Sequence, residues 1–226
     1  MKINYFSSKI TILKHYNNNF IIQFADLKNF CLFNCCEGFQ YFFSSYKHQY
    51  KIKNIAKIII TSMHINNLSG LIGLLSSLNL IGRFKSLHIY GPKDLIYYLE
   101  LNKKYSHTNF NYLIYIHVLS TGLIINDYNY RVYSFIIKNY YSFLVMQQEK
   151  FVTFLLSKAK GNGLVPNSFY SKLKIGLIFQ LPDGYLLNGS NFTAIYLFGS
   201  QISLLLDLYP RRSNTEMVLR SNYILS

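Results

Sequence analysis

A continuous β-branched run ends in a cluster of polar side chains. The run Ile55–Ser62 (IAKIIITS) is typical of a strand buried on both faces, and the loop MHINN follows it. The imidazole of His64 is a possible metal ligand, or it is a partly buried group hydrogen-bonded to backbone. The amide oxygens of Asn66 and Asn67 are weak, neutral donors that suit a hard cation such as Mg²⁺ or Ca²⁺. The loop therefore favours at most a weak metal site.

A carboxylate follows a second apolar run. Asp207 lies in QISLLLDLYP (Gln201–Pro210), which predicts a buried strand closed by proline. A carboxylate at a buried strand end requires a cation or hydrogen-bond donors. Either a metal ion or one of Arg211, Arg212 and His64 would satisfy it.

The segment Lys158–Gly176 (KAKGNGLVPNSFYSKLKIG) differs in composition from the rest of the chain, because it gathers lysines and glycines around two aromatic residues. Lysines interleaved with glycine and Tyr170 favour contacts with phosphate groups without base readout. A solvated lysine-rich loop would have the same composition. The lysines are Lys158, Lys160, Lys172 and Lys174.

The composition excludes an acidic or charge-balanced domain. The chain has 226 residues, with 23 Lys and Arg against 9 Asp and Glu, which gives a net charge of +14. Half of the residues are hydrophobic and 14% are charged, which is too apolar for a disordered chain. The charge is compatible with a nucleic-acid partner. The abundance of Asn, Tyr, Phe, Ile and Lys, without Trp, also fits an A/T-rich genome, and the biased codon usage of such a genome is an alternative source of part of the basicity.

Three cysteines, Cys31, Cys35 and Cys36, show no zinc-finger spacing, and the adjacent pair is interpreted as two ordinary thiols in a reducing compartment. The apolar stretches are interrupted before about 18 residues, so no transmembrane helix and no membrane partner are predicted. The N-terminal residues have neither a signal peptide nor a transit peptide pattern.

The order of periodic segments predicts one α+β domain over residues 1–226, with helices on the outer face of a sheet. Strands are predicted in the first 30 residues, in 29–38, 55–62 and 86–92, several times in 112–147, in 201–210 and from Tyr223. Helical patterns occupy 39–54, 68–83 and 93–105. A hairpin is predicted around Asp183 and Gly184.

Four colinear segments, with their spacing, resemble ribonuclease Z, the tRNA 3′-processing endonuclease family of the metallo-β-lactamase superfamily. The segments are LFNCCEGFQ (32–40), ITSMHINNLSGLIGLLSS (60–77), LIGRFKSLHIYGPKDL (80–95), and PNSFYSKLKIG with LPDGYLLNGSNF (166–192). The resemblance implies an αββα sandwich, truncated at the C-terminus, and a metal-dependent phosphodiester hydrolase. It also implies two zinc ions held by seven ligands.

Most of those ligand positions are changed in this chain. The family motif HxHxDH corresponds to Ser62, His64, Asn66 and Asn67, a further histidine to Asn139, and a bridging aspartate to Asp207. The last histidine would lie beyond Ser226. Only His64 and Asp207 keep the ligand type, and two ligands do not hold zinc, so zinc is expected to be absent and catalysis lost. Glu37 and Gln40 either orient the metal loop or cap a helix.

The resemblance assigns residues 150–192 to an arm, or exosite, that grips tRNA, with the four lysines and Tyr170 as the RNA-binding residues. The expected protein is a catalytically degenerate relative of ribonuclease Z. The alternatives are a non-catalytic tRNA-binding or dimerisation subunit, which forms a homodimer or pairs with an active relative, and a decaying reading frame. Composition and the likeness to plastid-encoded relatives predict an algal plastid product.

Overall fold

In the computed structural model, the chain is described over most of its length. The described residues are 3–6, 10–15, 19–24, 28–41, 51–137, 140–148, 150–165, 169–181, 183–197, 199–205, 212–219 and 221–225. The sequence-based predictions for Asn139, Asp207 and Arg211 lie outside these ranges.

The first layer of the body is a seven-stranded sheet with the order β1-β2-β3-β4-β5-β6-β7. Strands β1 to β4 are antiparallel and β4 to β7 are parallel, so the later connections cross over one face through helices. The strands are β1 (Ile3–Phe6), β2 (Ile10–His15), β3 (Asn19–Phe24), β4 (Phe30–Phe33), β5 (Ile55–Ile59), β6 (Leu87–Gly91) and β7 (Ile114–Val118).

Helices α2 (Ile65–Leu68), α3 (Leu71–Leu80) and α4 (Leu95–Ser106) follow the parallel strands, and the short helix η1 (Ile52–Asn54) precedes β5. Helix α3 buries Leu71, Leu74, Leu75 and Leu78, the three- and four-residue spacing of an apolar helix face. These leucines pack on the outer side of the seven-stranded sheet with Ile58 and Ile89, and this cluster is one half of the core.

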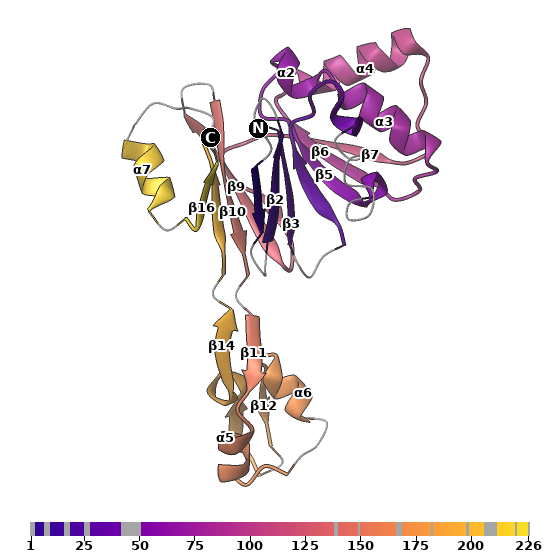
Figure 1. The fold of residues 1–226 in the computed structure, drawn as a ribbon. Helices are drawn as coiled ribbons and strands as arrows, with labels where there is room; N and C mark the ends of the chain where they lie inside the picture. Colours follow the sequence, from indigo (N-terminus) through magenta and orange to yellow (C-terminus); the bar gives the residue numbers. More distant parts are fainter. Residues whose placement is uncertain are drawn as a thin grey trace.

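A second, five-stranded sheet has the order β16-β15-β10-β9-β8. Its inner face packs Val132, Phe143 and Ile202 against Ile59 and Tyr90 of the first sheet, which gives the other half of the core. Figure 1 shows the layers in sequence from α7 through the five-stranded sheet and the seven-stranded sheet to α3 and α4. The elements are β8 (Gly122–Asn126), β9 (Tyr130–Ile137), β10 (Tyr140–Gln147), β15 (Gln201–Leu204), α7 (Arg212–Val218) and β16 (Tyr223–Leu225).

A small lobe projects from one end of the body, connected to it by the strand pair β11 and β14 (Figure 1). It contains β11 (Lys150–Phe154), α5 (Leu156–Gly161), α6 (Phe169–Lys174), β12 (Ile178–Gln180), β13 (Leu186–Asn188), η2 (Gly189–Phe192) and β14 (Thr193–Leu197). The lobe has its own apolar cluster around Ala159, Leu173, Leu187 and Phe192. The predicted hairpin is confirmed, because β12 pairs with β13 around the Asp183–Gly184 turn.

Some predicted boundaries are wrong. The strand predicted to end at Gly38 ends at Phe33, because Asn34 takes a left-handed conformation with φ 59°. The next strand ends at Ile59 and not at Ser62, since the chain turns into the polar loop. Of the helical pattern at 39–54, the described residues are helical only at 39–41 and 52–54. Within the described ranges, none of the helices is both long and apolar enough to cross a membrane.

Candidate functional site

The polar loop after β5 is anchored by a residue from a different strand connection. Asn34 is fully buried, and its Oδ1 accepts hydrogen bonds from both Thr61 N and Thr61 Oγ1, each at 2.9 Å. Asparagine tolerates the left-handed backbone that turns its amide toward the loop. This single side chain therefore fixes where the loop leaves the sheet.

The loop side chains are hydrogen-bonded to one another. Asn67 Nδ2 donates to Ser62 Oγ at 2.8 Å and to Thr61 Oγ1 at 3.3 Å. His64 is exposed, not partly buried as one of the two sequence-based interpretations had it. The backbone hydrogen bond of that interpretation is present, because His64 Nδ1 accepts from Asn66 N at 3.4 Å at the start of α2. Asn67 thus presents its NH₂ group, a donor, to the interior of the loop.

The loop packs against the two adjacent cysteines through backbone contacts. Cys35 N donates to Asn67 O at 2.7 Å, and Gly70 N donates to Cys35 O at 3.0 Å. The three cysteines are buried free thiols; burial raises the pKa of Cys31 to about 12 and also raises the pKa values of Cys35 and Cys36. High thiol pKa values suppress the reactive thiolate, in keeping with ordinary structural cysteines.

Gln40 and Glu37, which either orient the loop or cap a helix according to the sequence, have different surroundings. Gln40 Oε1 accepts a hydrogen bond from Ser77 Oγ at 2.9 Å, which joins the segment after β4 to α3. Glu37 is exposed in the turn before Phe39. Gln40 therefore contacts the helix behind the loop, through Ser77 of α3.

The described loop does not fit the zinc pair that the family resemblance implies. Ser62, Asn66 and Asn67 offer neutral oxygens or amide donors where zinc requires imidazole, thiolate or carboxylate ligands. Throughout the ranges that the structure describes, no three His, Cys, Asp or Glu side chains form a group that could hold a metal ion. The positions of Asp207 and Asn139 lie outside those ranges.

The four lysines that the sequence assigns to RNA binding are exposed in the projecting lobe, in two pairs. Lys158 and Lys160 lie on α5, and Lys172 and Lys174 lie on α6. The segment is therefore not an irregular loop over its described residues, because both pairs are carried by short helices. Tyr170 is only partly exposed: its OH donates to Leu164 O at 2.6 Å, and its ring lies 4.9 Å from that of Phe154. Tyr170 holds α6 against the rest of the lobe.

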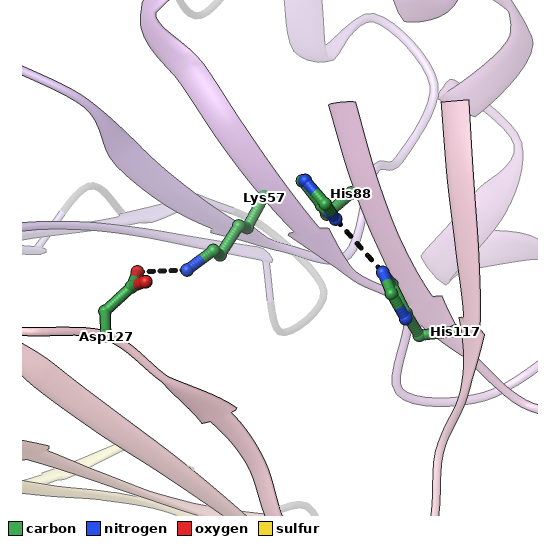
Figure 2. Close-up of polar contacts among 4 residues, drawn as sticks. All are labelled: Lys57, His88, His117 and Asp127. Carbon is green, nitrogen blue, oxygen red and sulfur yellow. Dashed lines mark hydrogen bonds and ion pairs between the residues drawn. The ribbon is translucent and has the colours of Figure 1, made fainter. Parts of the chain in front are cut away.

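A polar cluster between the two sheets was not predicted from the sequence. Lys57 of β5 forms an ion pair with Asp127, which lies between β8 and β9, and His88 Nδ1 lies 3.0 Å from Nε2 of His117 on β7 (Figure 2). Strand pairing aligns Lys57 with His88, and His88 with Tyr115, in one row. Period-two alternation in SLHIYGP and IYIHV was the available signal, but it does not reveal which strands are neighbours.

We expect the His88–His117 pair to make stability depend on pH. Burial, with His117 and Lys57 close by, lowers the pKa of His88 below its usual 6.5. Asp127 opposes this shift but does not cancel it. The unfolded chain therefore binds a proton before the native protein does, and the free energy of unfolding should decrease as the pH falls through 6.5. Urea unfolding at a series of pH values should show this decrease, and His88→Gln should make it shallower.

The matched control is His107→Asn, since His107 is exposed at the C-terminal end of α4 with φ 49°, a conformation that asparagine tolerates. This variant should keep the wild-type pH dependence. Equal slopes for wild type and His88→Gln would contradict the assignment.

Comparisons with known proteins give the family. No family model matches the sequence. Protein ycf56 of Pyropia yezoensis is 36% identical over 219 residues, which cover 96% of this chain and 81% of that protein. Protein ycf56 of Porphyra purpurea is 33% identical over 225 residues, covering 98% and 83%. Ribonuclease Z of Trichodesmium erythraeum is 36% identical over 163 residues, 71% of this chain and 50% of the relative, so the chain spans about half the length of that enzyme.

Among solved structures, a long form RNase Z from yeast matches with a TM-score of 0.50 at 13% identity, covering 87% of this chain and 28% of that one, which supports the fold alone. The layered arrangement of the sheets and helices, together with the similarity to the yeast and Trichodesmium erythraeum proteins, defines a protein of the metallo-β-lactamase fold that is homologous to ribonuclease Z. The chain belongs to the family of Ycf56 proteins. It covers more than four-fifths of the length of each of the two Ycf56 relatives above.

Proposed function

We propose that this Ycf56 protein binds tRNA and has lost the metal-dependent hydrolysis of ribonuclease Z. The observation that carries the proposal is a contrast between two sites. The loop at the metal positions is closed by hydrogen bonds among neutral side chains, whereas the lobe keeps both lysine pairs exposed. A decaying gene would be expected to lose both features together.

Shape-based recognition suits the lobe. Two lysine pairs on neighbouring helices can contact phosphates on the RNA backbone, and no base readout is needed for a substrate recognised by its fold. Tyr170 has a positioning role here, because its hydroxyl and ring fix α6 and thereby Lys172 and Lys174. The ycf56 relatives come from red algae, and we place this protein in a plastid by analogy with them.

Replacing Lys172 and Lys174 together by glutamine should weaken tRNA binding at least about tenfold at low salt. Each lost phosphate contact should also reduce the slope of log K against log salt by about 1. Filter binding with a labelled tRNA at several salt concentrations measures both quantities. The matched control is Lys103→Gln with Lys104→Gln, a pair of exposed lysines on α4, which should leave the affinity within about twofold of wild type.

Absence of salt-dependent tRNA binding by the wild-type protein would contradict the RNA-binding part of the proposal. The loss of catalysis is tested separately with precursor tRNA and either Zn²⁺ or Mn²⁺. No cleavage is expected. Cleavage that disappears in His64→Ala would refute the degenerate metal centre, as would two equivalents of zinc in the purified protein.

A second candidate function is assembly with another copy or with an active relative. It is favoured by an apolar stripe on α4, where Tyr97, Leu101 and Tyr105 recur every four residues and are 58%, 53% and 76% exposed. Light scattering during size-exclusion chromatography should then give twice the monomer mass, and Leu101→Lys should restore the monomer.

A further inference from the structure

The last residue of α3 and the turn that follows it carry unusually exposed apolar side chains. Leu80 is 87% exposed and Phe84 is 86% exposed, the two highest values among the large apolar residues that the structure describes, and Ile81 is 53% exposed. Gly82, with φ 74°, reverses the chain between them. Monomeric proteins normally expose single apolar side chains and not a group of three within one turn. We call Leu80, Ile81 and Phe84 the apolar tip.

The apolar tip is held rigidly by a buried arginine. The Arg83 side chain lies inward, and its guanidinium donates to Lys53 O at 3.0 Å, to Ile55 O at 2.8 Å, to Lys85 O at 2.8 Å and to Ser86 O at 2.8 Å. The turn is thereby fixed to the segment that leads into β5. Since Arg83 occupies the inner side of the turn, Phe84 next to it is directed to solvent.

The surroundings of the apolar tip are basic. Lys53 and Lys85 lie on neighbouring segments, because their carbonyl oxygens accept from the same guanidinium, and Lys51 is two residues from Lys53. All three lysines are exposed. No Asp or Glu occurs anywhere between Glu37 and Asp94 in the sequence. The tip therefore combines apolar side chains with positive charge from Lys51, Lys53 and Lys85, which we call the basic collar.

We propose that the apolar tip and its basic collar dock on an anionic lipid surface. Apolar side chains that enter the boundary between headgroups and acyl chains, with lysines at the level of the lipid phosphates, are the pattern of interfacial membrane binding. Two of the three tip residues are aliphatic and have no ring on which a nucleic-acid base can stack, which disfavours single-stranded RNA as the occupant. Surface binding needs no membrane-spanning helix, and it departs from the sequence-based expectation of no membrane partner.

The lipid contact is independent of the proposed tRNA contact, because the two use different lysines. Those of the basic collar belong to the segments before β5 and β6, whereas those of the lobe belong to α5 and α6. A protein that uses both surfaces would hold RNA at a membrane surface. Failure of one interaction leaves the other intact.

Co-sedimentation of the full chain with vesicles tests the proposal. Vesicles of phosphatidylcholine containing phosphatidylglycerol should bind the wild-type protein, and pure phosphatidylcholine vesicles should bind it at least about tenfold more weakly. Leu80→Ser with Phe84→Ser should lower the partition coefficient for the anionic vesicles about tenfold or more. Lys51→Gln, Lys53→Gln and Lys85→Gln together should abolish the preference for anionic vesicles and the sensitivity of binding to salt.

The matched control is Tyr128→Ser with Leu219→Ser, which removes two exposed apolar side chains outside both the apolar tip and the stripe on α4, and which should leave vesicle binding unchanged. The substituted tip residues are exposed, so circular dichroism should show a native fold in the double variant. Binding that is equal in the tip variant and wild type would overturn the proposal. So would a tip variant that converts a dimer to a monomer, or one that weakens tRNA binding while vesicle binding stays intact.

Discussion

Replacing Gly70 by alanine should lower the free energy of unfolding by about 4 kcal/mol or more, because the new methyl group has no space. A Cβ at this position would lie 2.0 Å from Cys36 O and 2.8 Å from Cys36 C, both of them backbone atoms. That backbone is itself held by the hydrogen bonds that join Cys35 to Gly70 and to Asn67. The clash is relieved only by displacing the loop at the metal positions. Urea unfolding followed by circular dichroism measures the loss.

The matched control is Gly73→Ala, one turn further along in α3. A Cβ there would approach only Gln40 Nε2, at 2.9 Å, which is the end of a flexible side chain. Alanine is favoured over glycine inside a helix by about 1 kcal/mol, so Gly73→Ala should be neutral or slightly stabilising. Equal destabilisation by both substitutions would show that Gly70 has no special close contact.

Replacing Arg83 by methionine should lower the free energy of unfolding by about 3 kcal/mol or more. Arg83 is 6% exposed, and its guanidinium supplies hydrogen bonds to four backbone carbonyl groups, those of Lys53, Ile55, Lys85 and Ser86. Methionine fills similar space but removes all four hydrogen bonds, of which the one to Ile55 O is buried, and a buried acceptor that loses its donor costs about 1–3 kcal/mol. Burial lowers the pKa of Arg83, but an arginine stays protonated throughout the pH range of such an experiment.

Lysine at position 83 should recover part of the stability, because one ammonium group replaces the planar fork that reaches all four carbonyl groups. Arg131→Met is the control, since Arg131 is exposed and makes an exposed hydrogen bond to Asn126 Oδ1 at 3.2 Å. Its effect should stay within about 0.5 kcal/mol. An Arg83→Met variant as stable as this control would contradict the stabilising role of the four hydrogen bonds from Arg83.

Local periodicity was sufficient for much of the fold. The leucines of α3 lie on one buried face as their spacing predicts, and the alternating N-terminal residues form the antiparallel strands β1, β2 and β3. Tyr223–Leu225 is strand β16, as predicted. These elements follow from the sequence because each presents one apolar face at its own period, every second residue in a strand and every third or fourth in a helix.

Where periodicity failed, a tertiary contact determined the outcome. The lysine-rich segment contains glycines and no long apolar pattern, yet α5 and α6 form around Ala159 and Leu173, which pack with Phe192 from η2. Short helices are stabilised mainly by such packing and not by intrinsic propensity, so their sequences carry little signal. The end of β4 depended likewise on Asn34, whose amide accepts from Thr61, 27 residues away in the chain.

The sequence by itself determined the class of the fold, the composition of the loop after β5 and the presence of a lysine-rich segment, because residues adjacent in the chain stay adjacent in space. Only the tertiary structure decided how Asn34 fixes that loop, how Arg83 holds the apolar tip outward, and how His88 and His117 meet between the sheets. These contacts join residues that are distant in the chain. Their geometry depends on strand order and register, which the packing of the whole core selects.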